Sequence, residues 1–221
     1  MPRADFEMNL TLVQEETIQL SSMVEKAIYK SVDSLKKRDV EASQQVIDED
    51  DLIDLKQEAL EERCIELIAL ESPIAGDLRI LISAMMIANE LERMGDYAEG
   101  IAKISVSMGN LPPLKPLIDI PRMAEKAVIM LRNSTQAFIS RDIDLARNVV
   151  ESDDEVDDLY NQVYRELLTY MLEEPGSIQR ATYLLWVAHD LERVADRATN
   201  IAERVIYLVT GQLVGNSALS N

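Results

Sequence analysis

A stretch of eight residues occurs twice in this sequence, and the repeat constrains the fold more than any other feature. The first copy, residues 89–96, reads NELERMGD, and the second, residues 189–196, reads HDLERVAD, one hundred residues later. Both copies contain the pattern L-E-R-x-x-D, and in both an Ile-Ala pair follows the aspartate at the same spacing. An internal repeat of this kind predicts two similar structural units in tandem.

Most of the chain has apolar residues at three-to-four spacing, the pattern of amphipathic helices. Glycine and proline are scarce, seven of each in 221 residues, so few breaks are available. We therefore predict an all-α protein, with a poorly ordered start over residues 1–7 and a loose tail after Gly211. The six expected helices span residues 8–37, 40–71, 73–108, 120–140, 143–173 and 177–210.

The breaks between these helices also repeat. Residues 38–41, Arg-Asp-Val-Glu, and residues 141–144, Arg-Asp-Ile-Asp, are predicted to form equivalent tight turns. Pro73 should end one helix and occupy the first turn of the next. In the second unit, Pro175 has the same role and Ser177 is a candidate N-cap. Gly109-Asn110 should end the third helix.

The segment Leu111-Pro112-Pro113-Leu114-Lys115-Pro116 is the clearest linker, because three prolines in five positions cannot continue a helix. It divides the chain into a first three-helix bundle (residues 1–110), the linker (residues 111–116) and a second three-helix bundle with a short tail (residues 117–221). Short turns force consecutive helices to run antiparallel. The expected architecture is two tandem three-helix bundles related by a pseudo-two-fold internal repeat.

The net charge of −18, from 22 basic and 40 acidic residues, argues against nucleic-acid binding, because phosphates would be repelled. Such a field attracts multivalent cations or a basic surface on a partner. The chain has one cysteine, Cys64, so no internal disulfide is expected. With no signal peptide and no run of 18 apolar residues, we expect a cytoplasmic protein that meets a membrane only through partners.

Four pairs of acidic residues stand four positions apart, so each pair shares one helical face. Counting residues from the turns near positions 72 and 175 places two pairs at nearly the same height in each unit. Four carboxylates can thus meet across one helix–helix groove in each unit. The pairs are Asp50 and Asp54 with Glu92 and Asp96, then Asp153 and Asp157 with Glu192 and Asp196.

Two explanations of these acids are open. A divalent or trivalent cation with a preference for oxygen ligands would offset the repulsion among them. Alternatively, Arg93 and Arg193 pair with acids of the facing helix, and no metal is needed. Asn89 and His189 lie one turn before the two motif glutamates and are possible additional ligands.

Catalysis has little support in the sequence. A ferritin-like di-iron site needs two Glu-x-x-His motifs, and the chain has one histidine. It offers no Ser/His/Asp set, no cysteine with a base and no glycine-rich phosphate loop. A metal-dependent hydrolase or oxidase, and a purely structural bundle with arginine-paired acids, are the alternatives to a binding protein.

Three stretches resemble the PhoU family of phosphate-uptake regulators. They are Asp-Leu-Arg at residues 77–79, LERMGDYA at residues 91–98 and LERVADRATNIAERVIYLVTG at residues 191–211. The resemblance covers nearly the whole chain and implies a non-enzymatic, dimeric negative regulator of phosphate uptake and phosphate-starvation signalling. The implied partners are the ATPase subunit of a phosphate ABC transporter and a phosphate-sensing histidine kinase.

The resemblance also implies metal clusters of Fe, Zn, Mn or Mg at the paired acids given above. This chain departs from the family pattern at three positions. Asn89 stands where an aspartate is frequent, Arg197 where a histidine is frequent, and Ala195 where glycine is usual. Fewer ligands could reduce the number of metals, and Arg197 could form an ion pair with Asp196 instead. We hypothesise that a rigid, acidic, metal-bearing face acts as an adaptor for a membrane-associated partner.

Overall fold

The structure, a computed structural model, describes residues 3–109 and 111–212, and helices are the only regular secondary structure in those ranges. The all-α prediction is confirmed. The long helices are α1 (Arg3–Lys37), α2 (Val40–Glu71), α3 (Gly76–Met108), α4 (Asp119–Ser140), α5 (Ile143–Glu173) and α6 (Ile178–Thr210), and a 3₁₀ turn, η1 (Pro175–Ser177), precedes α6.

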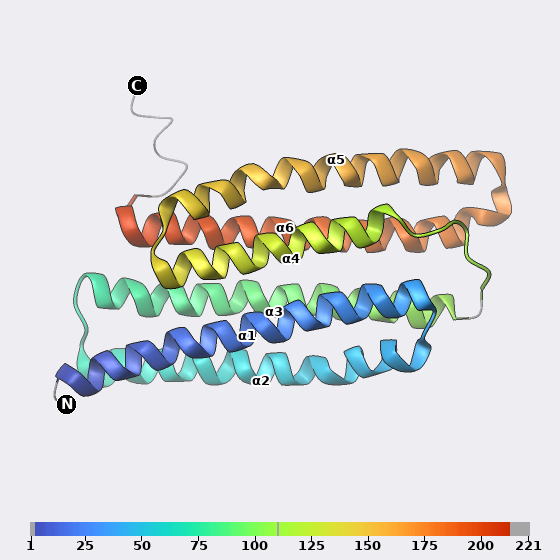
Figure 1. Ribbon diagram of the computed structural model, residues 1–221. Coiled ribbons are helices and arrows are strands. Elements are labelled where there is room, and N and C mark those ends of the chain that lie inside the picture. Colours follow the sequence, from blue (N-terminus) through green and yellow to red (C-terminus); the bar gives the residue numbers. More distant parts are fainter. Residues whose placement is uncertain (1–2, 110, 213–221) are drawn as a thin grey trace, which may run out of the picture.

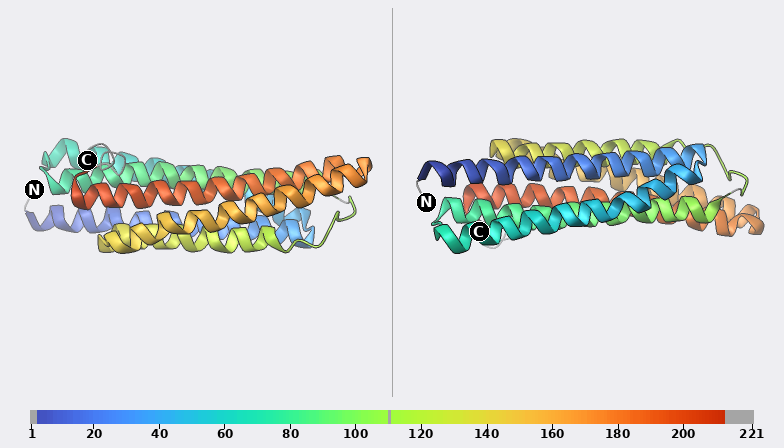
Figure 2. Two further views of the ribbon diagram at one scale, coloured as in Figure 1. Left: turned by 90° about the horizontal axis from the view of Figure 1, so that it is seen from above. Right: turned by 90° about the horizontal axis from the view of Figure 1, so that it is seen from below.

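The six helices form two three-helix units that lie side by side along their length (Figure 1). The units are in contact through α3 with α6 and through α1 with α4, and one apolar core runs through both. The α2–α3 turn and the α5–α6 turn lie at opposite ends of the molecule. The predicted repeat of a three-helix unit is thus present in residues 3–109 and 111–212. Figure 2 shows the elongated body from two further sides.

The repeated Arg-Asp turns have one conformation in both units. Arg38 and Arg141 adopt left-handed backbone angles, with φ of 61° and 56°. The next residue caps the following helix: Asp39 accepts a hydrogen bond from the Ala42 amide, and Asp142 accepts one from the Leu145 amide, both at 2.9 Å. Each aspartate cap is expected to stabilise its helix by about 1 kcal/mol. The predicted turns are confirmed.

Three predicted details of the helix ends are wrong. α1 already begins at Arg3, because Phe6 is buried and anchors the first turns in the core. α3 begins at Gly76 and not at Pro73, because both Ser72 and Ala75 have positive φ. Ser177 stands at the N-cap position of α6 but makes no side-chain capping bond, since its hydroxyl donates to the Tyr170 carbonyl at 2.9 Å and so completes the end of α5.

Other predicted features agree with the structure. Gly109 and Gly211 end α3 and α6 with positive φ, as expected for C-terminal glycines. Cys64 is buried in the core as a free thiol. Residues 111–118 form the non-helical link between the units. Asn110 and the tail from residue 213 onward lie outside the described residues. None of the described helices is apolar over a length that would cross a bilayer.

The core fixes where the acids point. Leu91 and Leu191, the leucines of the two L-E-R-x-x-D motifs, are fully buried. A side chain one position further along a helix lies 100° around it, so the motif glutamates are turned to the edge of the groove. On the facing helices, the buried Ile53 of α2 and Val156 of α5 orient the neighbouring aspartates in the same way.

Candidate metal centres

The first acidic cluster lies between α2 and α3. Asp50 and Asp54 of α2 and Asp96 of α3 each offer one carboxylate oxygen, and the three oxygens lie within 4.8 Å of one another. The pKa of Glu92, the fourth predicted residue, is raised by burial and then by the charges of Asp96 and Asp54. The three aspartates therefore come together as the helix heights predicted, and Glu92 flanks them.

These carboxylates repel one another in a partly buried groove. Burial raises the pKa of Asp50 to about 7, with further contributions from the charges of Glu99, Asp54 and Asp96. Burial, and then the charge of Asp54, also raises the pKa of Asp96. Glu99 itself forms an ion pair with Lys103, at 2.5 Å between Oε2 and Nζ. The charge of Lys103 lowers the pKa of Asp50 and only partly offsets these effects.

One oxygen of this cluster lacks a partner. Asp54 Oδ1 is buried and has no hydrogen-bond donor among residues 3–109 and 111–212. A buried polar atom without a partner is costly, by about 1–3 kcal/mol. A hard cation held by two or three carboxylates would provide what this oxygen lacks. The residues of the α2–α3 cluster thus fit a metal ion.

Gly95 allows the two helices to approach at this point. A Cβ atom at position 95 would lie 3.2 Å from two methyl carbons of Ile53 and 3.3 Å from Asp50 Oδ1. The absence of a side chain therefore leaves space for the Asp50 carboxylate over α3. Ala195 stands at the equivalent position of the second unit, so its methyl group occupies the place of the space that the α2–α3 cluster uses.

The second acidic cluster lies between α5 and α6. Burial, together with the charges of Asp196, Asp157 and Glu192, raises the pKa of Asp153 to about 6. The four predicted acids therefore act on one another across this groove as well. Burial also raises the pKa of Asp157 and of Asp196, and the guanidinium of Arg193 lowers both.

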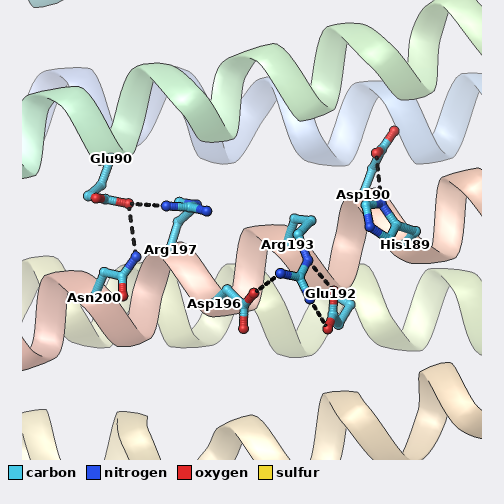
Figure 3. A network of polar contacts seen from close by, with 8 residues as sticks. All are labelled: Glu90, His189, Asp190, Glu192, Arg193, Asp196, Arg197 and Asn200. Carbon is cyan, nitrogen blue, oxygen red and sulfur yellow. Dashed lines mark hydrogen bonds and ion pairs between the residues drawn. The ribbon is translucent and has the colours of Figure 1, made fainter.

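Arg193 occupies part of the second cluster (Figure 3). Its Nε donates to Glu192 Oε2 at 2.5 Å, its Nη2 donates to the other oxygen of the same carboxylate, and its Nη1 lies 2.7 Å from Asp196 Oδ2. All three residues belong to α6, so the prediction that Arg193 pairs with the facing helix is wrong. The arginine instead holds two of the four acids on its own helix.

Arg93, the equivalent residue of the first unit, behaves differently. It is exposed and forms no ion pair within the described part of the chain. Its charge only lowers the pKa of Glu92 and of Asp96. The two clusters are thus unequal: the α2–α3 cluster has free carboxylates, and the α5–α6 cluster is closed by an internal arginine.

The three other candidate positions do not join the clusters. Asn89 donates from Nδ2 to the Met85 carbonyl of its own helix at 3.0 Å. His189 Nδ1 lies 3.6 Å from Asp190 Oδ1, and half of the histidine side chain is exposed. Arg197 does not pair with Asp196, contrary to the prediction.

Arg197 instead links the two units (Figure 3). Its Nη1 lies 3.3 Å from Glu90 Oε2 of α3, and Asn200 Nδ2 donates to the same oxygen at 3.3 Å. Sequence reasoning missed this contact because it depends on the packing of α3 against α6. The sequence feature that came closest to indicating this contact was the internal repeat, which places the acids Glu90 and Asp190 at equivalent positions.

A family model described as the PhoU domain matches two segments, residues 17–105 and 120–205. Each segment falls within one three-helix unit. The chain is 46% identical over 201 residues to the phosphate-specific transport system accessory protein PhoU homolog of Aquifex aeolicus, covering 91% of both proteins. A protein of the same name from Clostridium acetobutylicum is 37% identical over 215 residues, which is 97% of this chain and 98% of that relative.

Solved structures give the same result. The fold is similar to the crystal structure of PhoU from Pseudomonas aeruginosa, with a TM-score of 0.89 and 34% identity over 94% of this chain and 100% of that one. It is also similar to the phosphate transport system regulatory protein PhoU from Streptococcus pneumoniae, with a TM-score of 0.87 and 31% identity over 95% and 99% of the two chains.

Proposed function

The chain belongs to the PhoU family, and we propose that it is an accessory protein of a phosphate-specific transport system that restrains phosphate uptake. The family consists of accessory proteins and not of enzymes, as the sequence predicted. The names of the relatives support the link to phosphate transport.

The finer proposal is an adaptor in the cytoplasm. The chain would bind the ATPase subunit of the phosphate ABC transporter and the phosphate-sensing histidine kinase, and it would keep the phosphate-starvation response off when phosphate is plentiful. It would act as a homodimer and reach the membrane only through these partners. The family resemblance supports these assignments. The net charge of −18 is consistent with basic surfaces on the partners.

The adaptor is proposed to bind metal at its acidic clusters. The observation that carries this proposal is the α2–α3 cluster, in which three aspartate oxygens lie within 4.8 Å and one buried oxygen lacks a donor. Asp50, Asp54 and Asp96 would hold a divalent or trivalent ion (Fe, Zn, Mn or Mg), with Glu92 beside them. When bound, the ion would neutralise the acids and join α2 to α3.

The α5–α6 cluster is proposed to bind a cation more weakly. Asp153, Asp157, Glu192 and Asp196 are the candidate ligands, as the sequence predicted. Arg193 would have to leave two of these carboxylates before they could serve as ligands, because it pairs with Glu192 and Asp196. The alternative of arginine-paired acids thus has support in this unit only.

Cells that lack their own PhoU-type protein provide the test of the proposed function. Expression of the wild-type chain is expected to lower phosphate uptake and a phosphate-starvation reporter in phosphate-rich medium. The double variant Asp54→Asn, Asp96→Asn should lose most of this repression, because it neutralises two of the three clustered carboxylates. Uptake of labelled phosphate and reporter activity are the measurements.

The matched control is the double variant Asp48→Asn, Asp77→Asn, which removes one aspartate from each of the same two helices outside the cluster. It should repress like the wild type. A wild-type chain that leaves uptake and reporter unchanged would refute the proposed function, and a cluster variant that represses fully would refute the role of the acids.

A further inference from the structure

The second acidic cluster continues into an apolar surface along α5. Asp153, Asp157, Tyr160, Tyr164 and Leu168 follow one another at spacings of four, three, four and four residues. This spacing places all five on one side of the helix. The first two belong to the acidic cluster, and the other three extend the same side of α5 towards the α5–α6 turn at the end of the molecule (Figure 1).

The start of α6 adds to this surface, because α6 packs against α5 and runs back antiparallel to it. Several large apolar side chains are exposed here: Tyr164 at 40%, Leu172 at 83%, Ile178 at 49% and Trp186 at 55%. We call this surface the apolar strip. It consists of Tyr160, Tyr164, Leu168 and Leu172 of α5 with Ile178 of α6, and Trp186 lies on α6 at about the height of Tyr164.

The strip borders the acidic cluster directly. Tyr160 packs its ring 6.4 Å from that of Tyr164, between centroids, and burial together with the nearby charge of Glu192 raises its pKa. Trp186 is held by an edge-to-face contact with Tyr183, at 6.2 Å between centroids. Rigid aromatic side chains of this kind lose little conformational entropy on binding and are enriched at protein interfaces.

The fold does not require the two tyrosines of the strip. In the first unit, Gln57 and Glu61 occupy the positions of Tyr160 and Tyr164, at an offset of 103 residues. There the Gln57 amide donates to the Glu61 carboxylate at 3.0 Å. At these two positions α2 is therefore polar although it packs in an equivalent unit, whereas Ile65, the equivalent of Leu168, is apolar and 51% exposed. The exposed aromatic residues of α5 thus need an explanation other than folding.

The charges around the strip indicate the charge of a partner that would bind there. Between Glu151 and Glu174 the chain carries nine acidic residues and one basic residue, Arg165. Acids stand at both ends of the strip, at positions 157–158 and 173–174, and all four are exposed, although Glu174 lies 3.7 Å from Arg180 Nη2 in an ion pair. The distance along α5 between these ends is roughly 22 Å, the length of a helix of about 15 residues.

We propose that the apolar strip is the docking site for an amphipathic helix of a partner protein, whose apolar face covers the strip and whose lysines or arginines face the acids at its ends. The inference rests on the proposed function, since it names the class of partner that the adaptor would bind. Helices bound in grooves use such apolar anchors at three-to-four spacing, and flanking charges set orientation and speed of association.

A second copy of this chain fits the strip less well. Two copies paired about a two-fold axis present the same patch to each other. Because acids stand at both ends, this pairing would place acids opposite acids. An anionic bilayer is disfavoured for the same reason, since like charges repel near the membrane surface.

Trp186 provides a direct test, because it is the only tryptophan of the chain. The full chain is titrated with a synthetic amphipathic helical peptide of leucine and lysine, about 18 residues long. We expect a saturable blue shift of tryptophan emission with a stoichiometry of one peptide per chain. A peptide of the same composition with central prolines, which cannot form the helix, should not produce the shift.

The variant Leu168→Ser, Leu172→Ser removes two apolar side chains of the strip and keeps the reporter. Its affinity for the helical peptide should fall at least about tenfold. The matched control is Leu52→Ser, Leu55→Ser on α2, where the leucines are similarly exposed, at 54% and 60%. The control should bind like the wild type. Circular dichroism checks that both variants keep their helix content.

Three results would overturn the proposal. The first is equal peptide affinity of both double variants, which would indicate attraction by net charge alone. The second is a blue shift with phosphatidylglycerol vesicles but not with the peptide, which would indicate a lipid surface. The third is a wild-type dimer, by sedimentation, that becomes monomeric in the Leu168→Ser, Leu172→Ser variant, which would indicate a second copy on the strip.

Peptide binding and phosphate regulation are measured independently, so the two proposals can fail separately. If the chain binds the peptide through the strip but does not restrain phosphate uptake, the docking surface is supported and the proposed function is refuted. If the wild type restrains uptake but does not bind the peptide, and the Leu168→Ser, Leu172→Ser variant restrains uptake equally, the proposed function is supported and the docking surface is refuted.

Discussion

Replacement of Asp50 by asparagine is expected to raise the free energy of unfolding of the metal-free protein by about 1–2 kcal/mol at pH 8. The carboxylate is partly buried among Asp54, Asp96 and Glu99, and its pKa rises from 3.8 to about 7. The asparagine removes the charge that the folded state disfavours. The effect is smaller than the full pKa shift implies, because the side chain remains partly exposed to solvent, which screens its charge.

The stabilisation by Asp50→Asn should depend on pH. Between pH 4 and pH 7 the folded wild type binds a proton at Asp50 that the unfolded chain has lost. The stabilising contribution of Asp50 to the wild type is therefore fully present below pH 4, and it is lost as the pH rises towards 7. The advantage of the variant should be absent near pH 4 and complete at pH 8. Urea unfolding with a chelator at both pH values measures it.

Addition of metal should make the wild type more stable than Asp50→Asn, the reverse of the order expected without metal. A ligand at one hundred times its Kd stabilises the folded state by about 2.7 kcal/mol. The wild type should gain such stabilisation on addition of metal, and Asp50→Asn should gain little. Asp48→Asn, an exposed aspartate of the same helix, is the control and should change stability by less than about 0.5 kcal/mol. An Asp50→Asn variant that is less stable than the wild type without metal would contradict this account.

Replacement of Arg193 by glutamine is expected to have the opposite effects at the α5–α6 cluster. Without metal, the variant should lose about 1–3 kcal/mol of stability, because Glu192 and Asp196 lose the guanidinium that satisfies them. Metal binding at this cluster should strengthen about tenfold, equivalent to about 1.4 kcal/mol, because no ion pair has to break. Chelator-controlled unfolding and metal titration calorimetry measure the two effects.

Arg93→Gln is the matched control for Arg193→Gln. Arg93 occupies the equivalent position and forms no ion pair within the described residues. Its replacement should leave metal-free stability within about 0.5 kcal/mol of the wild type. Equal losses in the two variants would mean that the Arg193 contacts do not stabilise the fold, and unchanged metal affinity in Arg193→Gln would mean that arginine and metal do not compete.

Much of the fold was predictable because the sequence repeats itself. The two Arg-Asp turns and the terminal glycines at 109 and 211 set most helix ends to within a few residues. With a fixed rise per residue, these ends also determined the heights of the acids. The meeting of Asp50, Asp54 and Asp96 followed from that geometry alone.

The side-chain arrangement was less predictable. Spacing does not determine which rotamer an arginine adopts, so the pairing of Arg193 with acids of its own helix could not be foreseen. Spacing also does not show how two units pack, and the contact between Glu90 and Arg197 depends on the packing of α3 and α6. The late start of α3 depends on the positive φ of Ala75, a residue without a helix-stop preference.

The most direct test of the account is the metal content of protein purified without chelator, measured by elemental analysis for the wild type, Asp96→Asn and Asp196→Asn. The account predicts stoichiometric Fe, Zn, Mn or Mg in the wild type. It predicts loss of that metal in Asp96→Asn and its retention in Asp196→Asn, because the open carboxylates belong to the α2–α3 cluster. A folded wild type without metal, or an Asp96→Asn variant that keeps the wild-type metal content, would contradict the central claim.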